Sequence, residues 1–381
     1  MSFEISKNIV ETLEETGVNF FTTLPCEKVK QLYNLITKHF RHISLSREEE
    51  GVGICAGAYF AGAKPAMLVQ SSGVGTMINA LCSLTKVYRL PLLILVSWRG
   101  VYAEKIPAHI PLGKKLPKFL SAIDISYSII KDQEDISHIG KDAIEAYENN
   151  MIHMFLLHPT IWSEETSIIS DEANIREESK IFCSAKYEEI KPLKPTLTRL
   201  EILRVIASYL EGKIVVCNLG IPCKELYSIK HQKSNFYMLG SMGLASSIGL
   251  GISLFTSKDV VVVDGDGSLL MNLGALSTIA SAKPRNLTIL AIDNGVYGSS
   301  GNQPTATSFC VDLELTARGL GLEKTYKGAS REEIISVLQG LNDGPNFIHI
   351  LAKLGNANVP NVPLTPLEIK RNVMEALKDD A

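Results

Sequence analysis

The sequence predicts an α/β protein of two doubly wound parallel-sheet domains with no middle domain between them. Short apolar strands alternate with helix-periodic segments in both halves of the chain, which is typical of parallel sheets covered by helices. A polar, acidic stretch separates the halves and ends in Lys191-Pro-Leu-Lys-Pro195. The chain has 381 residues, 45% of them hydrophobic, which is enough for two or three domains with cores of their own.

The first half alternates strands and helices from its start. Strands are expected at 18–23, 42–46, 66–70 and 92–97, and helices at 27–38, 48–62 and 76–87. The helix at 48–62 is rich in Ala and Gly and is therefore suited to tight packing. We expect a first domain over 1–160 and a linker over 161–195.

The second half repeats this rhythm. Helices are expected at 198–211, 244–255, 268–282 and 366–378, and strands at 213–217, 260–264, 287–293 and 347–352. We expect a second domain over 196–381. The halves are similar in size and class, although no repeat is visible in their letters.

Composition excludes several classes of protein. The formal net charge of −3 gives no nucleic-acid signal. No apolar run reaches the roughly 18 residues of a membrane span, and the charged N-terminal segment does not resemble a signal peptide. The seven cysteines include no CxxC pair, so we expect free thiols in a reducing cytoplasm.

The most informative stretch covers residues 260–298. Four valines lead into Asp264-Gly-Asp-Gly267, and the next apolar strand ends at Asp293-Asn294. The two clusters are separated by about one crossover unit, so Asp266 and Asn294 are expected at the carboxyl ends of neighbouring strands. Ligands bind at such strand ends, and carboxylate and amide oxygens suit Mg²⁺.

The same stretch is also suited to a phosphate. Gly265 and Gly267 let the backbone approach an anion, and Ser268 opens a helix whose N-terminus favours negative charge. The alternative is an ordinary strand-to-helix turn in which Gly and Asp act as caps. The second polar cluster, correctly placed on the next strand, argues against that alternative.

These residues resemble the thiamin diphosphate motif of the decarboxylase and acetolactate synthase superfamily. The resemblance rests on GDG, an interval of 25 residues, then DN and GVYG. It implies that Asp266 and Asn294 bind Mg²⁺ through their side chains and Val296 through its carbonyl. It also implies that Tyr297 and Gly298 belong to the cofactor-binding segment. The family usually has Asn-Asn where this chain has Asp293-Asn294.

The resemblance implies two further contacts to the cofactor. In Gly240-Ser241-Met242-Gly243, Met242 matches the apolar residue that the family places between the two rings of the cofactor, and the Gly240 carbonyl would accept a hydrogen bond from the 4′-amino group. In the first half, the family's spacing to Gly57 and Lys64-Pro65 assigns Glu48 as the carboxylate that binds N1′ of the pyrimidine. Glu49 is the second choice, because three glutamates adjoin.

The family further implies a pyrimidine-binding domain (1–160) and a diphosphate-binding domain (196–381) that bind one cofactor between them, usually from different subunits. A homodimer or higher homo-oligomer is therefore expected. The short length and blocks such as REEEG (47–51) and GNQPT (301–305) resemble the sulfopyruvate decarboxylases of coenzyme M biosynthesis, often made as separate α and β chains that would be fused here. The implied reaction converts 3-sulfopyruvate to sulfoacetaldehyde and CO₂.

A substrate with two anionic groups needs cationic or hydrogen-bonding side chains near the cofactor. The candidates for substrate binding are Cys26, Arg47, Gln70, Ser71 and Arg99. Arg99 follows a buried strand and could bind an oxyanion through its guanidinium fork. His109, in a proline-flanked loop, could relay protons, although a plain surface histidine is an equal alternative.

Three alternatives can be weighed from the sequence. Phosphonopyruvate decarboxylases have similar sequence blocks, and physics alone does not separate a sulfonate from a phosphonate. A nicotinamide oxidoreductase would need a GxGxxG turn after the first strand, which is missing. A module that binds the cofactor without catalysis would not need a glutamate at the pyrimidine.

Overall fold

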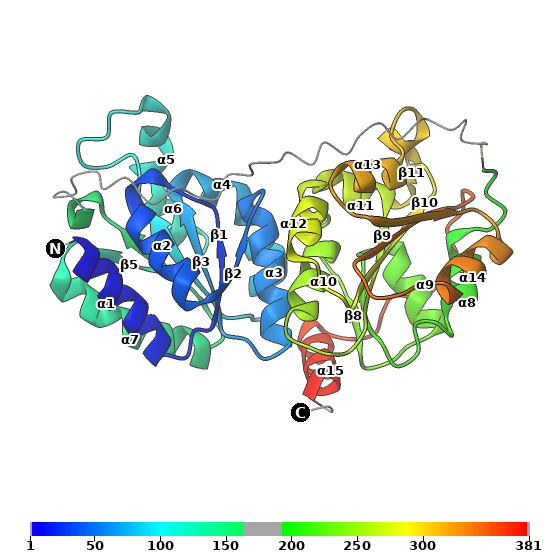
Figure 1. The fold of residues 1–381 in the computed structure, drawn as a ribbon, viewed down its shortest axis with the longest axis horizontal. Helices are drawn as coiled ribbons and strands as arrows, with labels where there is room; N and C mark the ends of the chain where they lie inside the picture. The colour runs from blue at the N-terminus through cyan, green and yellow to red at the C-terminus, as the bar shows by residue number, and fades with distance from the viewer. Residues whose placement is uncertain (1, 163–192, 379–381) are drawn as a thin grey trace.

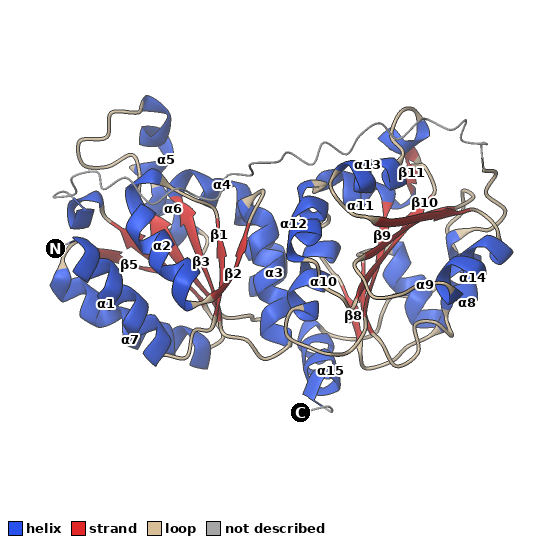
Figure 2. Cartoon of the chain, in the orientation of Figure 1, coloured by secondary structure: helices blue, strands red, loops and turns tan. Residues whose placement is uncertain are grey.

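The protein consists of two parallel six-stranded sheets, each covered by helices, that lie side by side (Figures 1 and 2). This computed structural model describes residues 2–162 and 193–378. The predicted pair of α/β domains is confirmed. Most of the expected linker, 161–195, lies outside the described residues, so the domain boundaries stay a prediction.

The first sheet has the strand order β2-β1-β3-β4-β6-β5. Its strands are β1 (Phe20–Thr23), β2 (Arg41–Ser44), β3 (Pro65–Gln70), β4 (Leu92–Ser97), β5 (Ser126–Ile130) and β6 (Ile152–Leu157). Its helices are α1 (Ser2–Glu15), α2 (Lys30–His39), α3 (Glu48–Phe60), α4 (Ser71–Ala80), α5 (Ile110–Gly113), α6 (Leu116–Ala122) and α7 (Gln133–Glu148).

The second sheet has the order β13-β14-β10-β9-β7-β8. Its strands are β7 (Ile214–Cys217), β8 (Asn235–Tyr237), β9 (Val260–Gly265), β10 (Leu287–Asp293), β13 (Lys324–Gly328) and β14 (Asn346–Leu351). Its helices are α8 (Arg199–Ile206), α9 (Ile221–Ile229), α10 (Ala245–Ser253), α11 (Asp266–Met271), α12 (Gly274–Ala282), α13 (Leu313–Gly319), α14 (Arg331–Gln339) and α15 (Pro366–Lys378). A short hairpin of β11 (Val296–Tyr297) and β12 (Gln303–Pro304) follows β10.

The two sheets are wound identically. If the strands of each domain are numbered along the chain, both sheets read 2-1-3-4-6-5. The two halves therefore share one topology although their sequences show no visible repeat.

Several elements differ from the sequence-based expectation. The helix expected at 268–282 is two helices, α11 and α12, because Asn272 leaves the helical region of backbone space (φ −147°, ψ 55°) and its side chain donates to the Gly243 carbonyl. The strands β5, β6, β8 and β13 are not among the expected ones. β5 is an edge strand with a half-buried pattern, so it lacks the continuous apolar run that marks the central strands.

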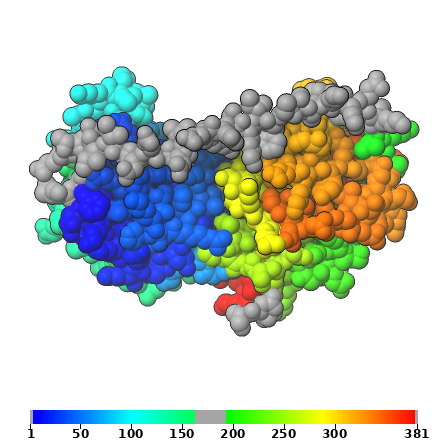
Figure 3. All heavy atoms as spheres, viewed as in Figure 1, coloured from blue at the N-terminus to red at the C-terminus, as the bar shows by residue number. Residues whose placement is uncertain are grey.

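The two domains meet through α3 and α10, whose backbones touch. A Cβ on Gly57 would lie 2.1 Å from the Ile248 carbonyl oxygen, and a Cβ on Gly251 would lie 2.0 Å from the Ile54 carbonyl oxygen. Gly53 faces Ser247 one turn earlier in both helices, so the helices run in the same direction. Figure 3 shows the blue surface of the first domain meeting the yellow and green surface of the second.

The junction also contains a fully buried carboxylate. Glu50, in the first turn of α3, accepts hydrogen bonds from the Ser46 backbone N–H at 2.5 Å and from Thr278 Oγ1 of α12 at 2.9 Å. One hydrophobic cluster continues through both domains, from Phe20 to Val373. The two domains therefore form one packed unit.

The described part of the chain can be searched for membrane-spanning helices and for paired cysteines. Among the described residues, no helix is both long and apolar enough to cross a membrane. The six described cysteines are free thiols, as expected, while Cys183 lies outside the described residues.

The helix contact gives a stability prediction. Gly57→Ala is expected to lower the free energy of unfolding by about 1–3 kcal/mol, because the new methyl group meets backbone atoms that cannot rotate away. Gly319→Ala in α13 is the matched control, since a Cβ there has nothing within 4 Å. It should be neutral or slightly stabilising. Urea unfolding of both variants checks the comparison, and equal stability of the two would contradict it.

Candidate active site

Two polar clusters lie at the carboxyl ends of β9 and β10, which are neighbours in the second sheet. Gly265 pairs with Ile292 across the two strands, so Asp266 and Asp293 follow at nearly the same level. Asp266 opens α11, and Asn294 begins the turn that leads into β11. Asp266, Asn294 and Val296 line one pocket. The structure therefore brings the three predicted metal donors together.

Most of the predicted cofactor-binding residues line this same pocket. They are Met242, Gly265, Asp266, Gly267, Ser268, Asn294, Val296, Tyr297 and Gly298. Gly240 and Ser241 are not among its lining residues, but they belong to the segment that carries Met242. That segment is tied to the GDG turn, because the Gly243 backbone N–H donates to Ser268 Oγ at 3.1 Å.

Glycine is required within this wall. A Cβ on Gly267 would lie 2.3 Å from the ring of Tyr297. Gly243 has φ +95°, in the left-handed region that favours glycine. The GDG turn therefore fits closely against β11 only because Gly267 has no side chain.

The pocket is surrounded by buried negative charge. Burial raises the pKa of Asp264 to about 6. Burial also raises the pKa of Asp266 to about 6, where a hydrogen bond from Thr305 opposes the shift and the Asp293 carboxylate adds to it. One oxygen of Asp264 is buried without a hydrogen-bond partner. Such a site suits a divalent cation, because a cation would offset the carboxylate charges.

The donor set fits magnesium by its chemistry. A carboxylate, an amide oxygen and a backbone carbonyl are hard oxygen ligands, and phosphate oxygens usually complete such a site. Within residues 2–162 and 193–378, no group of three or more His, Cys, Asp or Glu residues is placed to hold a metal ion. Only one of the three expected donors, Asp266, is of these four types, so this finding does not conflict with them.

The pocket contains residues that the sequence analysis missed. Asn218, directly after β7, and Arg199, in the first turn of α8, both line it. Arg199 is buried and pairs with Glu225 at 2.7 Å and with Asn356 Oδ1 at 3.0 Å. Asn356 in turn donates to the Gly298 carbonyl at 2.8 Å. A polar residue after the strand was a visible signal for Asn218, whereas nothing local pointed to Arg199.

Glu48 lies in the first turn of α3 and is not among the residues that line this pocket. Its Oε2 accepts a hydrogen bond from Thr76 Oγ1 at 3.1 Å, and its carboxylate lies directly over Gly73, where a Cβ would come within 2.1 Å. Among the described residues, every residue that lines the pocket belongs to the second domain. A single chain therefore does not bring Glu48 and Asp266 into one pocket.

The two neighbouring glutamates have other surroundings. Burial raises the pKa of Glu49, whose carboxylate lies 3.8 Å from Arg47 Nε. Glu50 is fully buried at the domain junction. Glu48 contacts α4 through Gly73 and Thr76, whereas Glu49 has a side-chain hydrogen bond with Asn79 of the same helix. Arg47 is half exposed and is not part of the substrate-side cluster described next.

Four of the predicted substrate-binding residues gather at the carboxyl ends of β1, β3 and β4. Cys26 Sγ lies 3.2 Å from Gln70 Oε1 and 3.2 Å from Ser97 Oγ. The Arg99 backbone N–H donates to Ser71 Oγ at 3.0 Å. The first sheet therefore presents its own polar cluster, distinct from the pocket of the second sheet.

The guanidinium of Arg99 is not a free fork, which corrects the expectation from the sequence. Its Nε and Nη2 donate to Glu104 at 2.7 and 2.9 Å, and both side chains are buried. Glu104 also accepts from the backbone N–H groups of Gly100 and Ile106. The hydrogen bond from Arg99 is the main reason that the pKa of Glu104 falls to about 2.

His109 lies in the loop that this ion pair closes. The loop projects from the first domain near α5 (Figure 1). A Cβ on Gly100 would meet the His109 carbonyl oxygen at 2.1 Å, so the base of the loop is tightly packed. The His109 side chain is partly exposed and makes no hydrogen bond to another described residue. Its role as a proton relay stays a prediction.

Comparison with protein families matches both halves of the chain. The family described as "Thiamine pyrophosphate enzyme, N-terminal TPP binding domain" matches residues 3–119. The family described as "Thiamine pyrophosphate enzyme, C-terminal TPP binding domain" matches residues 221–358. The second match contains the whole pocket except Arg199, Asn218 and Leu219.

Similar proteins cover nearly the whole chain. Sulfopyruvate decarboxylase of Methanosarcina acetivorans is 43% identical over 97% of this chain and 97% of its own. Phosphonopyruvate decarboxylase of Streptomyces viridochromogenes is 31% identical over 96% and 92%. A putative thiamin diphosphate-dependent enzyme from Mycobacterium smegmatis has the same fold, with a TM-score of 0.68 at 12% identity over 92% of this chain and 99% of its own. The chain therefore belongs to the thiamine pyrophosphate enzymes, in the group that contains the sulfopyruvate and phosphonopyruvate decarboxylases.

Proposed function

We propose that this chain is a thiamin diphosphate- and Mg²⁺-dependent decarboxylase that converts 3-sulfopyruvate to sulfoacetaldehyde and CO₂ in coenzyme M biosynthesis. The reaction breaks the bond between the carboxylate carbon and the keto carbon, and a proton replaces CO₂ on the keto carbon. One observation carries the proposal. The pocket joins Asp266, Asn294 and Val296 in a chain that is 43% identical, over 97% of its length, to a sulfopyruvate decarboxylase.

The second domain would hold the charged end of the cofactor. Asp266, Asn294 and the Val296 carbonyl would bind Mg²⁺, while the N-terminus of α11 at Gly267 and Ser268 favours the diphosphate. Met242, half buried in the same wall, would contact the rings. Bound thiamin diphosphate supplies a thiazolium ring that accepts the electron pair left when CO₂ departs.

The first domain would supply the acid–base group. We assign Glu48 to hold a proton at N1′ of the pyrimidine, because Thr76 and Gly73 fix its carboxylate in a partly exposed position. The more buried Glu50 accepts hydrogen bonds at the domain junction through Oε1, while its Oε2 is buried without a partner among the described residues. Glu49 remains the second choice.

Each site would be shared between two subunits. Glu48 and the pocket belong to different domains, and no described residue of the first domain lines the pocket. A homodimer in which the first domain of one subunit faces the second domain of its partner would complete two equivalent sites. A cytoplasmic location stays a prediction.

The substrate's anionic groups would meet the polar cluster of the first domain. Cys26, Gln70 and Ser71 offer small hydrogen-bonding groups there, and Arg99 keeps one guanidinium nitrogen, Nη1, outside its two contacts with Glu104. His109 would lie in the loop above this cluster. Phosphonopyruvate is the second candidate substrate, supported by the 31% identical phosphonopyruvate decarboxylase.

Turnover with the two substrates tests the proposal directly. Purified protein with Mg²⁺ and thiamin diphosphate should release CO₂ from 3-sulfopyruvate with a kcat/KM at least about tenfold above that for phosphonopyruvate, a difference of roughly 1.4 kcal/mol. Pyruvate, which lacks the second anion, is the matched control. Activity on phosphonopyruvate with none on 3-sulfopyruvate would overturn the substrate assignment.

Hybrid dimers test the shared site. Glu48→Gln should keep cofactor binding but reduce turnover by at least about 100-fold, because the acid–base group is lost. Asp266→Asn should lose Mg²⁺-dependent cofactor binding. Co-expressed with different affinity tags and purified through both, the two inactive chains should give hybrids with about half the wild-type activity, since one of the two sites is intact. Hybrids as inactive as both parents would contradict sharing.

The ion pair of Arg99 and Glu104 gives a pH-dependent prediction. Because the folded protein lowers the pKa of Glu104 from 4.5 to about 2, the pair contributes stability above pH 4.5 that is lost as the pH falls toward 2. Glu104→Gln should therefore reduce the free energy of unfolding by about 1–3 kcal/mol at pH 7. The deficit should shrink in urea titrations below pH 4.5. Lys105→Gln, exposed in the same loop, is the control, and a deficit independent of pH would refute the prediction.

A further inference from the structure

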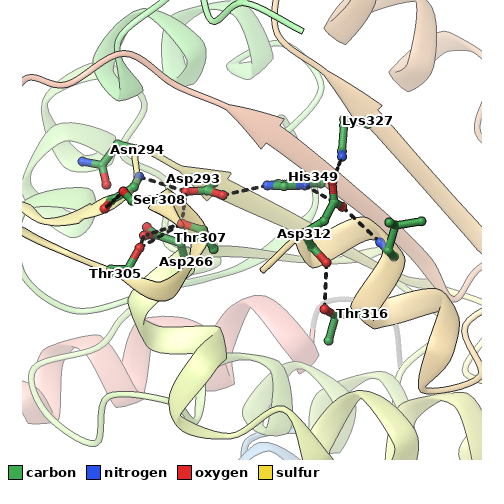
Figure 4. Close-up of polar contacts among 12 residues, drawn as sticks. Asp266, Asp293, Asn294, Thr305, Thr307, Ser308, Asp312, Thr316, Lys327 and His349 are labelled. Carbon is green, nitrogen blue, oxygen red and sulfur yellow. Dashed lines mark hydrogen bonds and ion pairs between the residues drawn. The ribbon is translucent and has the colours of Figure 1, made fainter. Parts of the chain in front are cut away.

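A buried histidine lies directly behind the turn that carries the predicted metal donors. His349 is on β14, beside β10, and is only 2% exposed. Its Nε2 lies 2.8 Å from Asp293 Oδ2 (Figure 4). Asp293 is the residue that departs from the usual Asn-Asn of the motif, and Asn294 follows it immediately.

Both oxygens of Asp293 are occupied by this chain. Oδ2 pairs with His349, while Oδ1 accepts from the Gly295 backbone N–H at 2.9 Å and from Thr307 Oγ1 at 2.8 Å. The carboxylate is therefore tied to β14 on one side and to its own turn on the other. This arrangement leaves Asn294, rather than Asp293, to face the pocket.

The far side of the imidazole is also acidic. Nδ1 of His349 lies 3.6 Å from Asp312 Oδ1, and Asp312 also caps α13 and pairs with Lys327 of β13 (Figure 4). Burial alone would lower the pKa of His349, but its contacts with Asp293 and Asp312 raise it. The imidazole thus lies between two carboxylates and pairs directly with the buried Asp293.

A second set of contacts links Asp293 to the other metal donor. Thr307 Oγ1 lies 3.4 Å from Asp266 Oδ2 as well as 2.8 Å from Asp293, and Thr305 Oγ1 donates to Asp266 at 2.5 Å. The Thr305 backbone N–H donates to the Gly295 carbonyl at 2.8 Å. The turn at 293–296 and Asp266 are therefore connected in one hydrogen-bonded unit.

We propose that His349 is a positioning residue for the metal site. By pairing with Asp293 it fixes the turn at 293–296, so that the Asn294 side chain and the Val296 carbonyl are preorganised to bind the cation. This inference rests on the proposed function. Residues that orient metal ligands in this way typically change metal affinity about 10–100-fold when they are removed.

The test is a calorimetric titration of the full-length protein with Mg²⁺ at a fixed concentration of thiamin diphosphate, which gives the Kd for Mg²⁺. His349→Gln should raise the Kd for Mg²⁺ about 10–100-fold. At saturating Mg²⁺, kcat for 3-sulfopyruvate should stay within about threefold of wild type, because no reacting atom is lost. A fall in kcat with an unchanged Kd would overturn the inference.

A double variant supplies the rescue. In Asp293→Asn/His349→Gln the buried charge is removed together with its partner, so the Kd for Mg²⁺ should return at least tenfold toward the wild-type value, as expected for two residues that act as a pair. Equal Kd values for the single and the double variant would contradict the pairing. Because the double variant has no uncompensated charge, it also keeps the test valid if His349→Gln folds poorly.

A matched control lies in the first domain. His153 is also a buried histidine near an aspartate, 3.7 Å from Asp142 Oδ2, with hydrogen bonds to Ser126 and Ser128. His153→Gln should leave the Kd for Mg²⁺ unchanged, and an equal loss of affinity would show a general folding defect and refute a specific role for His349. Wild-type protein that binds no Mg²⁺ with thiamin diphosphate would instead contradict the proposed function itself.

Discussion

The direct contact between the backbones of α3 and α10 determines how the two halves of the molecule face each other. Gly57 and Gly251 allow this contact, and no larger residue fits at either position without moving a backbone. Because the two helices run in the same direction, their N-terminal ends lie at the same end of the pair. Glu48 is in the first turn of α3, and Met242 is three residues before α10. The packing that joins the domains therefore places both segments at the same end of the helix pair, although in the proposed dimer each of them would contact a different cofactor.

The sequence predicted the fold class and the pocket of the second domain because both depend on local patterns. A run of four valines followed by Asp264-Gly-Asp-Gly267 specifies a buried strand and a tight turn, and the next strand brings Asn294 to the same edge. Prediction failed where tertiary contacts override local preference. The helix expected at 268–282 breaks at Asn272 because that side chain bonds to the distant Gly243 carbonyl.

Two further residues that the sequence analysis missed, His349 and Glu104, have partners that are remote or lie in irregular backbone. His349 is one polar residue in an apolar strand, and only the register of β14 against β10 brings it to Asp293. Glu104 is five residues from Arg99, but the loop between them has no regular period that would indicate a contact. The residue types of the site could therefore be predicted from the sequence. Which charged side chains pair with each other could be seen only in the folded structure.

The identical strand order of the two sheets bears on how the molecule evolved. α3 and α10 each follow the second strand of their own sheet, so the interface joins a helix to its topological counterpart. Such an arrangement is that of a dimer whose two copies have become one polypeptide. Duplication of one ancestral domain would explain both the shared strand order and the contact between corresponding helices.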